Sequence, residues 1–367
     1  MNQKSRAILA SLAILSLLSG CASTVSAPPK WPEVNVEGAE EELPVGAELL
    51  QRSALQELVD GTVSSTPPWG SIRPDARPVE QRIPDIIERG RIVVGVGQYL
   101  SRLGFRDPLS GELEGFEIDL AKEIAQDIFG DPSKVEFRYV ENRRREEALK
   151  TGDVDMVVRT WTITQPRQNT TEFSVPYLGI SSKLMVMRDS GITEKADLKN
   201  KTICATRDSA PTRTIDGIDI GGLLITRTWT DCLLAMQRNQ ADAIFSDDAI
   251  LSGLQAQDPS TTVIDTGEST SYYGVGMPAP TTGRRAEGLV MQVNSTIERI
   301  KADGTWDRLY EEWMQEYLGD PKSLPLKYRS EQENQEIYES RVQWLRNNTE
   351  SPVSRVAGTI NREDFHD

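Results

Sequence analysis

Short apolar runs and helix-like patterns alternate through the middle of this chain. Runs at 92–96, 154–158 and 243–245 are rich in β-branched and other apolar residues, as is typical of buried strands. After the first run, five apolar residues recur at helical spacing and Gly130 follows them: Ile118, Ala121, Ile124, Ala125 and Ile128. The segment "KVEFRYV" predicts a further strand. Strands that alternate with helices in this way predict an α/β fold with parallel strands.

The run at 154–158 ends in a dense group of polar side chains. These are Arg159, Thr160, Thr162, Thr164 and Arg167, with Trp161 among them. The guanidinium fork of arginine fits a carboxylate through two parallel hydrogen bonds. We therefore predict an anion-binding site at the carboxyl end of a strand. The alternative is a polar loop in which Arg167 forms a surface salt bridge.

The first residues predict an exported, lipid-anchored protein. Lys4 and Arg6 precede an apolar stretch at 7–19, which is too short to span a bilayer as a stable helix. Leu18-Ser19-Gly20-Cys21 follows and resembles a lipobox, which implies cleavage before Cys21 and lipid on its thiol. An ordinary signal peptide with an incidental cysteine is the alternative. We expect the mature protein on the extracytoplasmic face of the cell membrane.

Charge and histidine content exclude several kinds of function. The formal net charge of −15 argues against a nucleic-acid partner, and it means that local cations must hold an anionic ligand. The single histidine, His366, lies near the C-terminus, so the chain has no Ser-His-Asp triad and no histidine metal site. We expect no catalytic residue, no metal and no cofactor.

Two cysteines remain beyond Cys21. Outside the cytoplasm an isolated pair such as Cys204 and Cys232 predicts a disulfide, and two buried free thiols are the alternative.

The segment "TITQPRQNTTEFSVPY" resembles the "TIT-x-x-R … FS-x-PY" signature of the family 3 bacterial extracellular solute-binding proteins, the polar amino-acid receptors of ABC importers. Further segments resemble the family in the same order, among them "GELEGFEIDLA", "QADAIFSDD" and "VNSTIERIKADGTWDRLYEEW". The resemblance covers roughly 83–317. It implies a two-lobe clamshell of the type II periplasmic-binding-protein class, in which each lobe is a mostly parallel sheet flanked by helices.

The resemblance also implies a division of the chain. We expect a signal peptide at 1–21, an extended tether at 22–82 with one short helix near 47–59, lobe one at 83–187 and 274–318, and lobe two at 188–273. The remainder, 319–367, departs from the family. We expect one helix there, followed by a disordered end.

The family pattern assigns roles to the polar residues. It implies that Arg167, with Thr162 and Thr160 beside it, binds the α-carboxylate of an amino acid, and that Asp247 binds the α-ammonium. Asp248 is better suited to cap the following helix. Asp119 receives no ligand role.

Two further ligand contacts are weaker expectations from the family pattern. Arg145 would reach the mouth of the cleft, although Arg143, Arg144 and Arg145 can instead pair with the acids beside them, Glu141, Glu146 and Glu147. In lobe two the family usually carries Gly-Ser/Thr-Thr where this chain has Asp208-Ser209-Ala210. Ser209 is therefore the expected contact, with Thr212 as a reserve.

Arg159 decides the expected ligand. A second carboxylate, on the side chain of the ligand, would neutralise the charge of Arg159. This favours glutamate or aspartate over glutamine. A salt bridge from Arg159 to Asp208 or Glu172 would instead fit an uncharged ligand such as glutamine. The cysteine pair and the lipobox also resemble those of actinobacterial glutamate-binding lipoproteins.

We expect the protein to deliver a bound amino acid to an ABC permease and not to be an enzyme. The alternative is the sensor subunit of a membrane signalling system, which needs the same closing motion. An enzyme such as a dehydratase of prephenate-like acids stays open behind these two, because enzymes occur on this fold.

Overall fold

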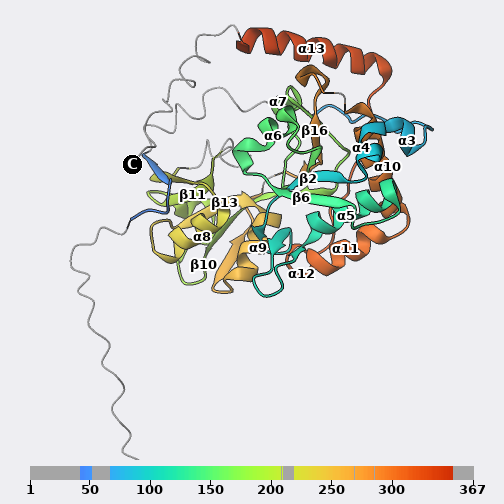
Figure 1. The fold of residues 1–367 in the computed structure, drawn as a ribbon. Coiled ribbons are helices and arrows are strands. Elements are labelled where there is room, and N and C mark those ends of the chain that lie inside the picture. Colours follow the sequence, from blue (N-terminus) through green and yellow to red (C-terminus); the bar gives the residue numbers. More distant parts are fainter. Residues whose placement is uncertain are drawn as a thin grey trace, which may run out of the picture. The chain divides into compact units, whose positions relative to one another are not determined.

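The computed structural model describes residues 42–51, 67–207, 209, 219–267, 269–284 and 286–349. Two mixed sheets dominate this part of the chain (Figure 1). We call the five-stranded sheet, order β6-β2-β7-β16-β8, and its helices lobe one. We call the six-stranded sheet, order β1-β12-β11-β13-β10-β14, and its helices lobe two.

The centre of the lobe-one sheet is parallel. Strand β2 (Ile92–Val96) pairs in parallel with β6 (Val135–Tyr139) and β7 (Met156–Val157), and β16 (Gly276–Pro278) and β8 (Thr171–Phe173) are antiparallel to their neighbours. Every residue of β2 is buried, as in a central strand that is covered on both faces. The β2-helix-β6 unit confirms the parallel pairing predicted from the periodicity.

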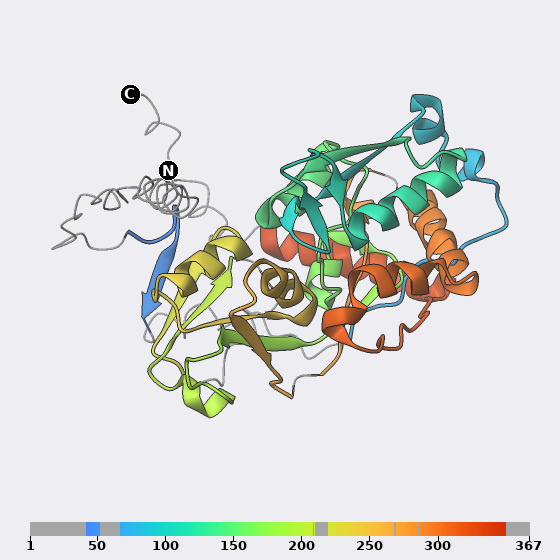
Figure 2. The ribbon, with the colours of Figure 1, turned by 90° about the horizontal axis from the view of Figure 1, so that it is seen from below.

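The helices of lobe one bury the predicted apolar stripe. They are α4 (Pro84–Arg89), α5 (Phe116–Phe129), α6 (Arg145–Thr151), α10 (Glu287–Ala302), α11 (Thr305–Trp313) and α12 (Gln315–Leu318). The five apolar residues predicted from helical spacing all lie in α5, and each is at most 5% exposed. Helices α5, α10 and α11 pack together on one side of the sheet (Figure 2). The closing helices therefore return to lobe one, as the family resemblance implies.

Lobe two repeats the same arrangement. Strands β12 (Gly222–Thr226), β11 (Thr202–Thr206) and β13 (Ala243–Asp247) are parallel, while β10 (Ser182–Met187) and β14 (Thr261–Ile264) are antiparallel additions. Helices α8 (Trp229–Gln237) and α9 (Asp248–Gln257) cover this sheet. The buried strand predicted at 243–245 is confirmed and continues to Asp247.

The chain crosses between the lobes through paired segments. Strands β9 (Leu178–Ile180) and β15 (Ser271–Tyr273) form a two-stranded antiparallel sheet. Strand β10 follows β9 at once and pairs with β13, so the crossing lies before β10 and not at residue 187 as predicted. The apolar run continues through both strands, which is why no break in the pattern marks the crossing.

The remaining elements are short. They are β3 (Tyr99–Leu100), β4 (Gly104–Arg106), β5 (Leu113–Glu114), α3 (Val79–Arg82), α7 (Gln165–Gln168), η1 (Asn142–Arg144), η2 (Lys195–Leu198) and η4 (Pro280–Thr282). Strands β3 to β5 form a small antiparallel sheet of their own.

The N-terminal segment departs from the predicted tether. Residues 48–51 form strand β1 (Glu48–Gln51), antiparallel to β12, where a helix was predicted. The prediction was wrong because a partner edge, rather than local preference, decides whether so short a segment is a strand. Residues 67–82 are not an extended tether either, since Ser71 and Ile72 are buried and α3 packs on α10. The helix expected in the C-terminal extension is present as α13 (Glu331–Thr349).

Candidate ligand-binding site

The polar segment after β7 turns sharply at Thr160. This residue has φ 36°, which a β-branched residue rarely adopts. Its backbone N–H donates to Glu117 Oε1 at 2.5 Å, and Trp161 and Thr162 follow in buried positions. Gly276 makes room for the Trp161 ring, because a Cβ at this position would lie 2.4 Å from the indole. The turn thus directs the chain from the sheet edge towards α7.

Arg167 lies in α7 and is 5% exposed. Its Nη1 donates to the carbonyl oxygen of Thr162 at 2.9 Å, and Thr162 in turn forms a β-bridge with Tyr273. The structure therefore places Arg167 beside Thr162 near the crossover strands. The charge of Arg167 lowers the pKa of Asp247 in lobe two.

Arg145 points inward, whereas its two neighbours do not. Arg143 and Arg144 pair with Glu141 and Glu147, as the alternative interpretation expected. Arg145 is buried, lies 4.7 Å from the Trp161 ring centroid and donates from Nη1 to the carbonyl oxygen of Arg159 at 3.2 Å. Burial lowers the pKa of Arg145 well below its usual value, and the nearby charges of Arg167 and Arg159 lower it further.

Arg159 lies between two tyrosines. It donates from Nη2 to the hydroxyl of Tyr99, and its guanidinium lies 5.4 and 5.5 Å from the ring centroids of Tyr99 and Tyr139. Arg159 is 2% exposed, and its Nη1 has no hydrogen-bond partner among the described residues. The predicted alternative pairing with Glu172 is wrong, because that carboxylate binds Arg329 and Arg341. The other alternative partner, Asp208, lies outside the described residues.

Asp247 ends strand β13, and its carboxylate is buried. It accepts hydrogen bonds from Tyr273 Oη at 2.8 Å and Ser182 Oγ at 3.3 Å. Burial raises the pKa of Asp247 to about 6, and neighbouring Asp248 also raises it, while Tyr273 and Arg167 act in the opposite direction. A buried carboxylate of this kind is suited to bind a cation.

Asp248 has a different set of partners. It is the first residue of α9 and accepts from the N–H groups of Ser181 at 3.1 Å and Ala249 at 3.0 Å. Its second oxygen binds Lys322 Nζ at 2.6 Å. Asp248 therefore stabilises the start of the helix, although it lies one residue after the cap position, which Asp247 occupies without a side-chain cap bond.

The lobe-two loop that the family pattern assigns to the site is described only at Ser209. Ser209 is 7% exposed, and its N–H donates to the carbonyl oxygen of Thr206 at 3.3 Å. The reserve candidate Thr212 lies outside the described residues.

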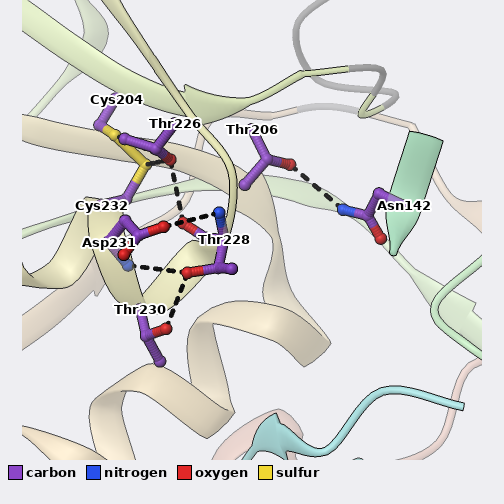
Figure 3. The surroundings of a disulfide bond; sticks show 8 residues. All are labelled: Asn142, Cys204, Thr206, Thr226, Thr228, Thr230, Asp231 and Cys232. Atoms are coloured by element: carbon purple, nitrogen blue, oxygen red, sulfur yellow. Dashed lines mark hydrogen bonds between the residues drawn. A yellow bond between two sulfur atoms is a disulfide. The ribbon is translucent and has the colours of Figure 1, made fainter. Parts of the chain in front are cut away.

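The two lobes contact each other through residues that follow β6 in lobe one and through β11 and the residue after β12 in lobe two. Arg227 Nη2 pairs with Glu141 Oε1 at 3.0 Å, and Asn142 Nδ2 lies 3.5 Å from Thr206 Oγ1 (Figure 3). A cavity of about 640 Å³ opens here and is lined by residues of both lobes together with Gly46: Glu141, Asn142, Arg143, Arg207, Thr226 and Arg227. This cavity lies between the lobes, and none of the predicted ligand-binding residues lines it.

The predicted disulfide between Cys204 and Cys232 is present. It joins β11 to α8 within lobe two, with 5.5 Å between the Cα atoms (Figure 3). Thr226 Oγ1 lies 3.2 Å from the Cys232 sulfur, so the bridge sits in the buried interior of the lobe.

Sequence reasoning missed Glu117. This buried carboxylate accepts from the Thr160 N–H and, at 2.6 Å, from Tyr177 Oη, and burial raises its pKa. Asp119, two residues on, binds Lys122 and Trp313 instead. The available signal for Glu117 was an acid in the first turn of a helix, which is also common where an acid only complements the helix dipole.

Some expectations concern residues outside the described part, among them the lipidation of Cys21 and the position of His366. Among the described residues, no group of His, Cys, Asp and Glu side chains is arranged to hold a metal ion. Within the same residues, no helix is both long and apolar enough to cross a bilayer.

Relatives and solved structures resemble this chain over most of its length. The glutamine-binding protein GlnH of an ABC transporter in Bacillus subtilis is 31% identical over 63% of this chain and 84% of its own. The glutamate-binding protein GluB of Corynebacterium glutamicum is 30% identical over 62% and 79%. The solved L-cysteine solute receptor of Neisseria gonorrhoeae has a TM-score of 0.59 and 25% identity, covering 65% of this chain and 95% of that one.

A family model decides the assignment. The model of the "Bacterial extracellular solute-binding proteins, family 3" matches residues 92–316, which is more than half of the chain. The segments at 67–82 and 319–349 lie outside this match, whereas the residues of the candidate site lie inside it. The protein belongs to the bacterial extracellular solute-binding proteins, family 3.

Proposed function

We propose that this protein is a lipid-anchored extracytoplasmic receptor that closes on a polar amino acid and delivers it to an ABC importer. Lipid on Cys21 would hold it at the outer face of the cell membrane. The names of its relatives support this function, since they bind glutamine or glutamate. Glutamate or aspartate is the proposed ligand, with glutamine next.

One observation carries the proposal: a buried guanidinium and a buried carboxylate are each bound to the same pair of bridged residues, because Arg167 donates to Thr162, Tyr273 donates to Asp247, and Thr162 forms a β-bridge with Tyr273. In this proposal Arg167 of lobe one, with Thr162 and Thr160 beside it, binds the α-carboxylate of the amino acid. Asp247 of lobe two binds the α-ammonium. Micromolar affinity needs about −8 kcal/mol, and hydrogen bonds to charged groups contribute roughly 1.5–3 kcal/mol each. The main-chain groups of the ligand therefore supply much of the affinity, and its side chain supplies selectivity.

Charge balance favours an acidic side chain. The described site holds three buried cations, Arg145, Arg159 and Arg167, and two buried carboxylates, Glu117 and Asp247. A ligand with net charge −1 balances these five side chains, whereas zwitterionic glutamine leaves them with a net charge of +1. The Arg159 Nη1, which has no partner among the described residues, is the donor that a side-chain carboxylate would meet.

A thermal-melt screen tests the ligand class. The protein beginning after Cys21 is unfolded and refolded to remove carried-over ligand, and each common amino acid is then added. A ligand at about a hundredfold its dissociation constant stabilises the fold by nearly 3 kcal/mol, which shifts the melting temperature visibly. We expect glutamate or aspartate to give the largest shift, and Arg167→Ala to abolish it.

Selectivity is tested at Arg159. We expect Arg159→Gln to reduce the affinity for glutamate more than that for glutamine, while Arg144→Gln, at an exposed cation paired with Glu147, changes neither. A wild-type preference for glutamine would overturn the acidic assignment, and the absence of any amino-acid response would overturn the receptor function. Turnover of a bound acid would instead indicate an enzyme. One solved structure that resembles this chain is that of the ancestral amino-acid-binding protein AncCDT-1, a precursor of cyclohexadienyl dehydratase.

A further inference from the structure

Helix α7 carries Arg167 but is only one turn long. So short a helix is not stable alone, because the first turn fixes several residues for a single hydrogen bond. The N–H groups of Asn169 and Thr170 bind the carbonyl oxygens of Pro166 and Arg167, so the carbonyl oxygen of Gln168 is left for a partner from elsewhere in the chain. The orientation of Arg167 therefore depends on the groups that hold α7 from outside.

Gln168, the last residue of α7, forms three hydrogen bonds with two residues from outside the helix. The Trp69 N–H donates to Gln168 Oε1 at 2.8 Å, and Gln168 Nε2 donates to the Trp69 carbonyl oxygen at 3.1 Å. Arg341 of α13 donates from Nε to the Gln168 carbonyl oxygen at 2.7 Å. A cation at the C-terminal end of a helix binds free carbonyl groups and complements the helix dipole. Arg341 is thus a cap for α7 that comes from a distant part of the chain.

A buried ionic group fixes Arg341 in turn. Arg341 Nη1 lies 2.6 Å from Glu172 Oε2, and Arg329 Nη2 lies 2.8 Å from Glu172 Oε1. The side chains of Arg341, Glu172 and Arg329 are only 1%, 2% and 4% exposed. Removing one member of a buried ionic group leaves an uncompensated charge, so these three side chains are expected to stay together.

The holding residues all come from segments outside the family match. Trp69, Arg329 and Arg341 lie before residue 92 or after residue 316, whereas α7 and Glu172 lie within the matched region. Backbone hydrogen bonds join the two outer segments: the Ser71 N–H donates to Lys327 O at 2.9 Å, and the Arg329 N–H donates to Ser71 O at 3.0 Å. In Figure 1, α13 lies above α7 at this end of lobe one.

We propose that the outer segments 68–72 and 327–341 form a clamp that positions α7 for ligand binding, with Arg341 as its positioning residue. This inference rests on the proposed function, because α7 carries Arg167, the expected partner of the ligand α-carboxylate. Displacing that guanidinium by a fraction of an ångström weakens a bidentate contact, which depends on direction as well as distance.

Arg341→Met tests the clamp and leaves Glu172 paired with Arg329. We expect the dissociation constant of the amino acid that binds the wild type to rise about tenfold, mainly through faster dissociation. Arg341→Lys keeps a charge but not the fork that reaches both Gln168 and Glu172, so its affinity should lie between the two. The control is Arg299→Met, which breaks an ionic group of the same lobe with Glu123 and Asp127 and should leave the affinity unchanged.

Affinity is measured by calorimetry at a temperature at which circular dichroism shows each variant folded. A folded Arg341→Met protein with the wild-type dissociation constant would overturn the clamp, and Arg341→Lys decides by the same criterion if Arg341→Met does not fold. If the wild type binds no amino acid, the proposed function fails by itself. Hydrogen exchange of the amides at 167–170 then tests the clamp alone: faster exchange in Arg341→Met than in Arg299→Met supports it, and equal exchange overturns it.

Discussion

The affinity for an amino acid should depend on pH through Asp247. This carboxylate is buried beside Asp248, and its pKa is raised to about 6. The hydrogen bonds from Tyr273 and Ser182 and the charge of Arg167 lower the pKa but do not cancel the effect of burial. The protein therefore holds a proton on Asp247 at a pH at which an exposed aspartate has lost it.

The sign follows from the charge that the ligand needs. An α-ammonium binds the ionised carboxylate, so below pH 6 the ligand must displace a proton from Asp247. The ionised fraction falls about tenfold for each pH unit below the pKa. We expect the dissociation constant to be nearly constant above pH 7 and about tenfold higher at pH 5 than at pH 7, a loss of ~1.4 kcal/mol.

Isothermal titration at pH 5, 6, 7 and 8 measures this dependence. Repeating the titration in two buffers with different ionisation enthalpies counts the protons released, which should approach one at pH 5 and zero at pH 8. Asp247→Asn keeps the shape of the side chain but cannot titrate, so its weaker binding should not change between pH 5 and pH 7. Equal wild-type affinities at pH 5 and pH 7, or an unchanged pH dependence in Asp247→Asn, would refute the assignment of Asp247 to the ammonium.

Three further outcomes follow from the described contacts. Arg167→Lys loses the bidentate fork and should weaken binding by about ten- to a hundredfold in calorimetry, so a change below threefold would contradict its role. Replacing Cys204 and Cys232 by serine should lower the free energy of unfolding in urea by about 3–4 kcal/mol, because the bridge closes a loop with a sequence separation of 28, and a reducing agent should then have no further effect. Glu172→Gln leaves two buried guanidiniums without a carboxylate and should cost about 3–5 kcal/mol of stability, and an unchanged urea midpoint would show that water reaches this group.

Local periodicity was sufficient to predict the elements that position the site. The apolar run of β2 and the helical spacing in α5 are both confirmed, since each depends only on which side of an element faces the core. The same reasoning placed polar side chains at the ends of β7 and β13, and Arg159 and Asp247 lie there as expected. Strands β7 and β13 belong to different sheets, so the pattern placed each polar residue at the end of its own strand, and the pairing of the two lobes came only from the family resemblance.

The inward turn of Arg145 needed more than local pattern. Its neighbours Arg143 and Arg144 have the same charge and the same adjacent acids, yet they pair at the surface. Arg145 differs because it begins α6, and from this position its side chain reaches the face of Trp161. The family pattern singled out Arg145 for the mouth of the cleft, and its contact with a ligand stays a prediction, whereas charge pairing by itself could not separate the three arginines.

The outer segments show where sequence reasoning stops. Arg341 lies in a helix of polar residues, "SEQENQEIYESRVQWLRNN", and such a pattern indicates a solvent-exposed helix. It is buried beside Glu172, which is far away in the sequence and is paired with Arg329 and Arg341 of this extension. The sequence pattern places Glu172 in the ligand-binding loop and Arg341 on the surface. Only the three-dimensional structure shows that they are paired. The extension is for this reason part of the folded lobe, and a chain cut back to the family-matched region would bury Glu172 without a partner.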